Sequence, residues 1–330
     1  MELKISWAND FFFLIFLQNF VLANEPSKKL EYSKNDYAFI TNQQSNKLDV
    51  INLRDLKKVA EIDIGNSPAG IEIDQENKMI FISNPKGNNV SVFDIKQNNI
   101  FFLESGESPL GITLSSNKQK LYVSNWYNNT LTVINIKLNK IENVVKVGES
   151  PAGIDVDNES GHIIVANRGS NSVSILNEKS YEIVEEIFVE KAPFGVFFDS
   201  HKKNIFISNV QSNSISVINS NTLKLVKNIK VGKWPYQVAF DKKNDRIFVT
   251  NQRGNSITII ESNTLEVIRT ISDFCEYPEG IDINYNKSII VVACWFDDEV
   301  AILDLLDYSL IKKIPVSGGP RAFGSFILQN

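Results

Sequence analysis

Histidine and cysteine are both scarce in this chain of 330 residues, which has two of each. The cysteines, Cys275 and Cys294, are too few for a disulfide-built scaffold or a zinc cluster. A haem site would need a CxxCH motif or an axial histidine, and there is no CxxCH. His162 and His201 lie at a strand end and in a turn, with no serine–aspartate pair or metal-ligating group around them. We therefore predict no catalytic residue, no metal and no cofactor.

An excess of charge of one sign is also missing. The chain has 34 basic and 39 acidic residues, a net charge of −5 and a pI near 5.3. Such a chain has no global field that would recruit nucleic acid or an anionic membrane. With 43% hydrophobic and 22% charged residues, it has the composition of an ordinary globular protein. We expect a monomer with no nucleic-acid partner.

Long hydrophobic runs are absent except for Phe11–Ala23, which has thirteen residues. This length suits a secretory signal peptide, and the small residue Ala23 suits cleavage after it. The run is too short to cross a bilayer comfortably. We predict a signal peptide at residues 1–23, a polar linker at 24–36 and a periplasmic or extracellular protein with no membrane span in its mature part. An uncleaved N-terminal anchor is the alternative.

What the sequence has in abundance is a repeat. Seven prolines follow one another at intervals of 41 to 43 residues, namely Pro68, Pro109, Pro151, Pro193, Pro235, Pro278 and Pro320. A second landmark ends a hydrophobic run in each unit, at Asn42, Asn84, Asn125, Asn167, Asn209, Asn251 and Cys294. An asparagine in this position is expected to bond its own loop backbone rather than a ligand. So regular a period must be considered before any other feature.

Each unit contains four short strand candidates with polar turns between them. The first follows the proline, as in Ala152–Asp157, and the second ends at the asparagine, as in Ile247–Thr250. The third ends in a polar residue, and the fourth mixes charged with apolar residues, as in Leu225–Val231. A four-stranded meander repeated at about forty residues is typical of a β-propeller blade. We predict an all-β, seven-bladed propeller of antiparallel blades over residues 37–327, as a single domain.

The two ends of the repeat array predict how the ring closes. The array begins at Tyr37 with a second strand and ends after Pro320 with a first strand, Arg321–Ile327. The C-terminal strand should therefore be the innermost strand of the N-terminal blade.

The run-ends ITN, ISN, VSN, VAN and VTN, with the GxxP turn and the third-strand pattern, resemble the YVTN-type seven-bladed β-propeller repeat. The resemblance extends from Tyr37 to Ile327. It implies a secreted or periplasmic propeller and does not imply a particular reaction, because a fold alone does not supply the chemistry.

In an antiparallel blade the second strand returns to the end where the first began, so two sets of turns share one face. We name this the top face: the loops after the second strands and the turns before the repeat prolines. Aromatic and arginine side chains gather there, and Arg253 is expected on the same side. The candidate ligand-binding residues are Trp126, Arg168, Phe194, Trp234, Tyr236, Glu279, Trp295 and Arg321. Together they favour an amphipathic binding surface, although bulky side chains that merely plug the channel are the alternative.

The two cysteines lie at the two ends of one predicted hairpin, which should bring them together on the top face. Cys275 precedes the first strand of the last unit, and Cys294 ends its second strand, where the other units have asparagine. We predict a disulfide between them, with two unpaired thiols as the alternative.

Three functional hypotheses remain. The first is a binding module that takes an unknown small molecule or a protein loop on its top face. The second is an enzyme or enzyme accessory, either a lactonase-like hydrolase or a partner of a periplasmic dehydrogenase. The third is an interaction scaffold with no small ligand.

Overall fold

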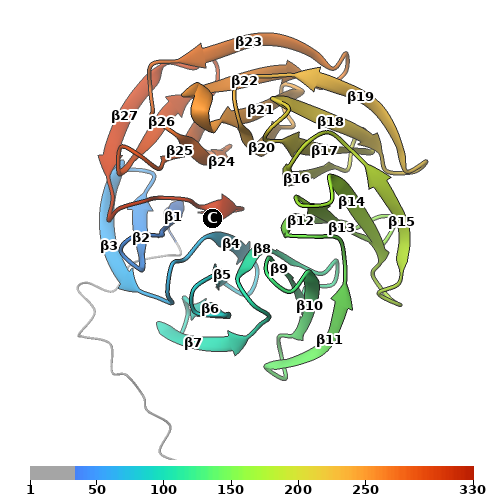
Figure 1. Ribbon diagram of the computed structural model, residues 1–330. Coiled ribbons are helices and arrows are strands. Elements are labelled where there is room, and N and C mark those ends of the chain that lie inside the picture. Colours follow the sequence, from blue (N-terminus) through green and yellow to red (C-terminus); the bar gives the residue numbers. More distant parts are fainter. Residues whose placement is uncertain (1–33) are drawn as a thin grey trace, which may run out of the picture. The chain divides into compact units, whose positions relative to one another are not determined.

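Residues 34–330 are described by the computed structural model, and they form seven sheets around a central channel (Figure 1). Each sheet holds one blade of four antiparallel strands, numbered here from first (inner) to fourth (outer), and the sheet of blade 2 has a fifth strand at its inner edge. The predicted all-β propeller is therefore confirmed. The predicted signal peptide and most of the predicted linker lie outside the described residues. Within those residues, no helix is long and apolar enough to cross a membrane.

The two inner strands of the blades surround the channel. The first strands are β4 (Gly70–Asp74), β8 (Pro109–Leu114), β12 (Pro151–Asp157), β16 (Pro193–Asp199), β20 (Pro235–Asp241) and β24 (Pro278–Asn284), in blades 2 to 7. The second strands are β1 (Tyr37–Asn42), β5 (Met79–Asn84), β9 (Lys120–Asn125), β13 (His162–Asn167), β17 (Asn204–Asn209), β21 (Arg246–Asn251) and β25 (Ile289–Cys294), in blades 1 to 7.

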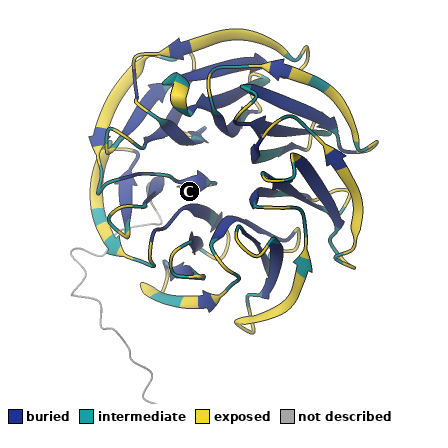
Figure 2. Cartoon of the chain, in the orientation of Figure 1, coloured by how far each residue is buried: buried dark blue, intermediate teal, exposed yellow. Residues whose placement is uncertain are grey.

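The two outer strands complete each blade. The third strands are β2 (Lys47–Asn52), β6 (Asn89–Asp94), β10 (Thr130–Asn135), β14 (Ser172–Asn177), β18 (Ser214–Asn219), β22 (Ser256–Glu261) and β26 (Glu299–Asp304). The fourth strands are β3 (Lys57–Asp63), β7 (Asn99–Glu104), β11 (Lys140–Lys146), β15 (Ile183–Phe188), β19 (Lys224–Lys230), β23 (Glu266–Ser272) and β27 (Leu310–Pro315). Figure 2 shows burial falling outward, from buried inner strands to exposed fourth strands. A single turn of 3-10 helix, Gln252–Gly254, follows β21.

In blades 3 to 7, the first strand begins with a bulge at its proline. In blade 4, Pro151 pairs with Asn167, and pairing resumes only at Ile154 with Val165. Between them lies Gly153, where a Cβ atom would collide with the carbonyl oxygen of Phe194 in the next blade. The glycine is required because the innermost strands converge at the channel.

Neighbouring blades are tied together by a hydrogen bond that repeats around the ring. In blade 1, Asn46 has a φ of 60° in the loop after β1, and its Oδ1 accepts the N–H of Ser67, the residue before Pro68, at 2.8 Å. The equivalent bonds join Asn88 to Ser108, Asn129 to Ser150, Asn171 to Ala192, Asn213 to Trp234, Asn255 to Tyr277 and Asp298 to Gly319. These links fix the top-face turns in which the candidate binding residues lie.

The strand-ending asparagines have a structural role, but most have other partners than expected, Asn42 being the one that donates only to backbone carbonyls. They are fully buried, and Asn167 donates from Nδ2 to the hydroxyls of Ser172 and Ser174 on the third strand. Asn251 contacts Ser256 and Thr258 in the same way. The sequence predicts bonds to the asparagine's own loop backbone instead. The third strand competes successfully because antiparallel pairing places its hydroxyls opposite the buried amide.

The ring closes as predicted, through the C-terminal segment. β29 (Ile327–Leu328) pairs antiparallel with β1 and is the innermost strand of blade 1. One detail differs from the continuous strand that the sequence predicts, because β28 (Phe323–Gly324) turns aside to pair in parallel with β4 of blade 2. Gly324 has a φ of 137°, a conformation that favours glycine, and it lies against the backbone of Ile71. The segment therefore binds blade 1 and blade 2 at once.

Candidate functional site

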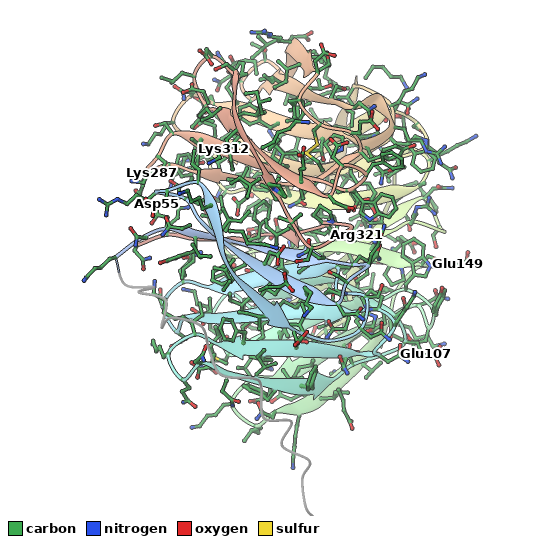
Figure 3. The ribbon with its side chains drawn as sticks, turned by 90° about the vertical axis from the view of Figure 1, so that its left-hand side faces the viewer. Asp55, Glu107, Glu149, Lys287, Lys312 and Arg321 are labelled. Carbon is green, nitrogen blue, oxygen red and sulfur yellow. A yellow bond between two sulfur atoms is a disulfide. The ribbon has the colours of Figure 1, made fainter. Side chains whose placement is uncertain are left out.

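The top face carries a pocket at the mouth of the channel. The side view in Figure 3 places Glu107 and Glu149, from turns before the repeat prolines, on one side of the ring, together with Arg321. Asp55 and Lys287, from turns at the other ends of the strands, lie on the opposite side. The cavity at the top mouth has a volume of about 420 Å³. Its size falls in the range of small-molecule pockets, ~300–1,000 Å³.

Two rings of equivalent repeat positions build this pocket. The outer ring consists of the residues directly after the second strands, Gln43, Pro85, Trp126, Arg168, Val210, Gln252 and Trp295, and all but Trp295 line the pocket. The inner ring consists of the residues directly after the repeat prolines, Ala69, Leu110, Ala152, Phe194, Tyr236, Glu279 and Arg321. Of these, four line the pocket: Leu110, Phe194, Tyr236 and Arg321. The repeat therefore places one side chain per blade at each of two levels.

Three aromatic rings form the floor. Phe194 contacts Tyr236 with ring centroids 4.2 Å apart and Phe323 with centroids 4.9 Å apart. All three are buried, at 4%, 8% and 6% exposure. Buried rings and partly exposed residues thus lie at different depths in the mouth of the channel. The buried rings close the channel, and the partly exposed residues above them form the pocket walls.

Two arginine–tryptophan pairs stand at the rim. Arg168 lies over the ring of Trp126, 5.5 Å from its centroid, and Arg253 lies over Trp234 at 3.6 Å. Stacked guanidinium groups of this kind retain their charge and their N–H donors. No carboxylate of the described residues forms an ion pair with either arginine. Positive charge at this mouth is therefore available to a ligand.

A third arginine is neutralised within the protein. Arg321 donates from Nε to Glu279 Oε2 at 2.8 Å, and the side chains are 13% and 4% exposed. Gln252 donates to the other carboxylate oxygen of Glu279 at 2.5 Å. Arg321 also donates from Nη2 to the hydroxyl oxygen of Tyr236. This network holds Arg321 in one orientation at the pocket wall.

Burial sets the protonation of the two partners of Arg321. It raises the pKa of Tyr236, and the charge of Arg321 only partly opposes the shift. Burial also raises the pKa of Glu279, against the effects of Arg321 and Gln252. Tyr236 is therefore protonated at physiological pH, and because its oxygen accepts from Arg321, its hydrogen is available for donation to a ligand.

The structure brings six of the eight predicted residues to the pocket lining: Trp126, Arg168, Phe194, Trp234, Tyr236 and Arg321. The other two, Glu279 and Trp295, both belong to blade 7, the one blade that contributes no lining residue. Glu279 lies behind Arg321 rather than in the pocket, while Trp295 is partly buried outside it. The floor residue Phe323 is not predicted from the sequence, because the turn at Gly324 breaks the repeat register just after it. Leu110 is not among the predicted residues either, although its position directly after Pro109 is the signal that identifies it.

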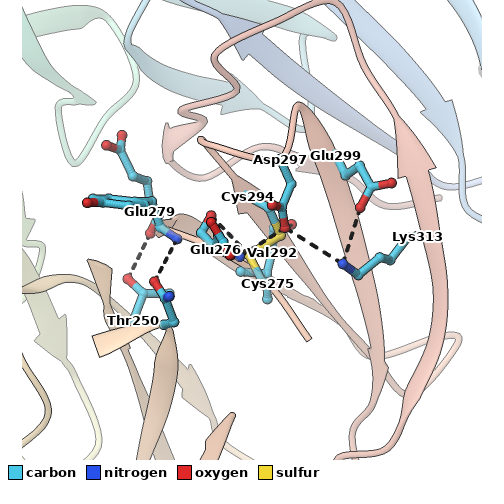
Figure 4. Close-up of a disulfide and its surroundings, with 11 residues drawn as sticks. Thr250, Cys275, Glu276, Glu279, Val292, Cys294, Asp297, Glu299 and Lys313 are labelled. Carbon is cyan, nitrogen blue, oxygen red and sulfur yellow. Dashed lines mark hydrogen bonds and ion pairs between the residues drawn. A yellow bond between two sulfur atoms is a disulfide. The ribbon is translucent and has the colours of Figure 1, made fainter. Parts of the chain in front are cut away.

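The predicted disulfide is present in blade 7. Cys275 and Cys294 are bonded, with their Cα atoms 5.5 Å apart (Figure 4). Asp297 accepts the N–H of Glu276 beside the bridge and forms an ion pair with Lys313. Among the described residues, Cys275, Cys294 and Asp297 are the only three whose possible ligand atoms lie within metal-binding reach of one another, but the disulfide occupies both sulfurs.

Removing this disulfide should lower the free energy of unfolding by about 3 kcal/mol, because the bridge closes a loop of 19 residues. The double variant Cys275→Ala/Cys294→Ala avoids an unpaired thiol, and urea unfolding measures the loss. In non-reduced, denatured wild-type protein, an alkylating reagent should modify neither sulfur. Two alkylated thiols there would contradict the bridge.

A closed seven-bladed propeller with an aromatic and arginine-rich pocket at one mouth is the class that the fold and the site define. The chain belongs to the family described as "Lactonase, 7-bladed beta-propeller", whose model matches residues 103–184 and 190–283, more than half of the chain. No curated protein sequence matches the chain.

Solved structures share the fold at low sequence identity. A functionally unknown protein from Desulfotomaculum acetoxidans is 12% identical, with a TM-score of 0.77 over 88% of this chain and 99% of that one. Hydrazine synthase from Kuenenia stuttgartiensis is 18% identical, with a TM-score of 0.70 over 77% and 88%. The dihydro-heme d1 dehydrogenase NirN is 10% identical, with a TM-score of 0.66 over 86% and 74%. At these identities the likeness concerns the fold alone.

Proposed function

We propose that the protein is a binding module whose top-face pocket takes a planar or sugar-like organic anion. The observation that carries this proposal is the Arg168–Trp126 pair at the pocket wall, a charged group stacked on an aromatic ring with no carboxylate partner among the described residues. The indole supplies a flat surface for a ring, and the guanidinium supplies paired donors for a carboxylate or phosphate. The hydroxyl of Tyr236 adds a donor from below.

We further infer that it works outside the cytoplasm, as a secreted or periplasmic protein. The Cys275–Cys294 disulfide supports this location, because such bonds persist in oxidising compartments. The signal-like run at the N-terminus points the same way. The run-ends of the repeat support placing the chain beside YVTN-type propellers within the lactonase-type family.

Lactone hydrolysis is the second candidate, and the description of the matching family favours it. Arg168 could stabilise the negative charge that forms on the carbonyl oxygen when water attacks a lactone. The reaction also needs a base, but no carboxylate lines the pocket. Glu279, which lies behind Arg321, has both oxygens engaged by Arg321 and Gln252. Binding is therefore the function that the geometry supports better. One structural neighbour is a dehydrogenase by name, but its fold-level likeness does not favour that chemistry here.

The proposal is tested by calorimetric titration with gluconate, a sugar-like anion, and benzoate, a planar one. Arg168→Ala should weaken binding by about tenfold or more, since a hydrogen bond to a charged group contributes ~1.5–3 kcal/mol. Trp126→Ala should weaken it through lost stacking. Trp295→Ala is the matched control, because Trp295 occupies the same repeat position as Trp126 but lies outside the pocket, and it should leave affinity unchanged.

Three results would contradict the proposal. One is that neither anion binds. Another is that Trp126→Ala and Arg168→Ala bind as well as wild type while remaining folded. The third is that a set of γ- and δ-lactones is hydrolysed at a rate that Glu279→Gln abolishes, which would favour the enzyme.

A further inference from the structure

A second cavity lies in the channel below the aromatic floor. Its volume is about 360 Å³, and it shares no lining residue with the top-face pocket. The lining includes Asn158 and Ser200, which are exposed in turns at the face opposite the top. Phe194, Tyr236 and Phe323 separate the two cavities. This lower cavity therefore opens to solvent from the other side of the ring.

The chemistry of its wall differs from one side to the other. Glu72, Asp155 and Asp282 occupy one and the same register position in the first strands of blades 2, 4 and 7. All three line the cavity, and no lysine, arginine or histidine does. In blades 5 and 6 that position holds Phe197 and Ala239. The cavity thus has an acidic arc and an apolar arc.

The carboxylates differ in how far the protein satisfies them. Asp155 accepts the N–H groups of Val156 and Phe198, and Asp282 accepts those of Ile283, Phe326 and Ile327. These two residues connect neighbouring inner strands. The side chain of Glu72 has no hydrogen bond or ion pair to any described residue. Its carboxylate is therefore the group best placed to contact a ligand.

Gln237 supplies an independent sign of a missing partner. It stands where other blades have the glycine of the first strand, and it is 8% exposed. Its Nε2 donates to the carbonyl oxygen of Gly324 at 2.9 Å, but its Oε1 is buried and has no partner among the described residues. Because a buried acceptor without a donor is costly, this oxygen indicates a donor that a bound molecule would bring.

The electrostatics agree with that geometry. Burial raises the pKa of Glu72 well above its ordinary value, and repulsion from Asp155 and Asp282 adds to the shift. Burial also raises the pKa of Asp155 and that of Asp282 to about 6. Three carboxylates thus share one cavity with no cation of the protein to balance them.

We propose that the lower cavity binds a small organic cation with ammonium groups on an alkyl chain, such as a diamine. The ammonium groups meet Glu72 and the other carboxylates, and an N–H reaches Oε1 of Gln237. The alkyl chain lies along the apolar arc, where Phe197 and Phe240 pack with centroids 6.0 Å apart. A single metal ion fits less well, because these three carboxylates are not all within 4.8 Å of one another. A divalent metal also requires oxygen ligands at about 2–2.6 Å.

The test is calorimetric titration of the full chain with diaminoalkanes of increasing length, with butylamine and with calcium chloride. At least one diamine should bind more tightly than butylamine. Glu72→Gln should weaken that binding by about tenfold or more, because it removes one charge-assisted contact. Glu104→Gln is the matched control, since Glu104 is exposed on a fourth strand and loses the same charge. The Glu104→Gln variant should bind the diamine with the affinity of wild type.

A second variant allows the test to be made even if the first does not fold. If Glu72→Gln fails to give a wild-type melting curve, Gln237→Met removes the buried acceptor at similar volume and should weaken binding likewise. The proposal is overturned if no diamine binds wild type, if calcium binds and no diamine does, or if a folded variant of either position binds like wild type.

Discussion

A chain that ends at Gly319 should not fold cooperatively. The truncation removes Phe323, Phe326, Ile327 and Leu328, four large side chains that are buried to 94% or more. Burying each such side chain contributes ~1.5–3 kcal/mol, so the loss is about 6–12 kcal/mol. This is comparable with the whole stability of a typical domain, ~5–15 kcal/mol. Circular dichroism of the truncated protein should show no sharp melting transition.

A shorter truncation is the control for closure. A chain that ends at Leu328 keeps both closing strands and loses only Gln329 and Asn330. Of these, Asn330 donates its N–H to Asp36 and Gln329 donates its N–H to Gln75. Loss of such peripheral hydrogen bonds costs about 1 kcal/mol each. If the Gly319 chain melts like the Leu328 chain, ring closure by β28 and β29 does not stabilise the propeller.

Breaking the Arg321–Glu279 pair should be the most destabilising single change at the top face. Arg321→Met leaves the carboxylate of Glu279, which is 4% exposed, without its cation. Removing one partner of a buried pair costs ~3–5 kcal/mol, because an uncompensated charge remains. Little of this figure is screened by solvent, since the Arg321 side chain is only 13% exposed. Urea unfolding of the folded variant measures the loss directly.

The double variant Arg321→Met/Glu279→Leu separates pairing from packing. With both charges replaced by apolar groups of similar size, most of the lost stability should return. The coupling energy of the double-mutant cycle should then be several kcal/mol. Two results would show that the charges do not depend on one another. One is that Arg321→Met lowers the free energy of unfolding by less than ~1 kcal/mol. The other is that the effects of the two single variants add up to the effect of the double variant.

The sequence predicts the fold almost completely because the information is local and repeated. The proline turn, the crowded glycine and the buried asparagine recur in nearly every unit, and each has a physical role at the same place in its blade. The sequence also predicts how the ring closes, because the repeat array begins with a second strand and ends with a first strand. The fold details it misses include the turn at Gly324 and the partners of the asparagines. Both features depend on the groups that a neighbouring strand places opposite them, and the repeat period does not determine those groups.

The candidate site is predicted in part, for a reason that Trp126 and Trp295 illustrate. The repeat places both directly after a second strand, yet only Trp126 lines the pocket. Blade 7 also differs in its inner-ring residue, because Glu279 pairs with Arg321 of the adjacent closing segment and lies behind it. The acidic residues of the lower cavity were missed for another reason. They appear in the sequence as ordinary polar residues of alternating strands, and only the convergence of the blades brings them together.

The most direct test of the top-face pocket uses the indole N–H signals of its tryptophans in an NMR titration with gluconate or benzoate. Single Trp→Phe variants assign the signals. The account predicts that Trp126 and Trp234 shift on saturation with the anion, whereas Trp295, on the same face but outside the pocket, does not. Equal shifts of all three signals, or a shift of Trp295 alone, would contradict it.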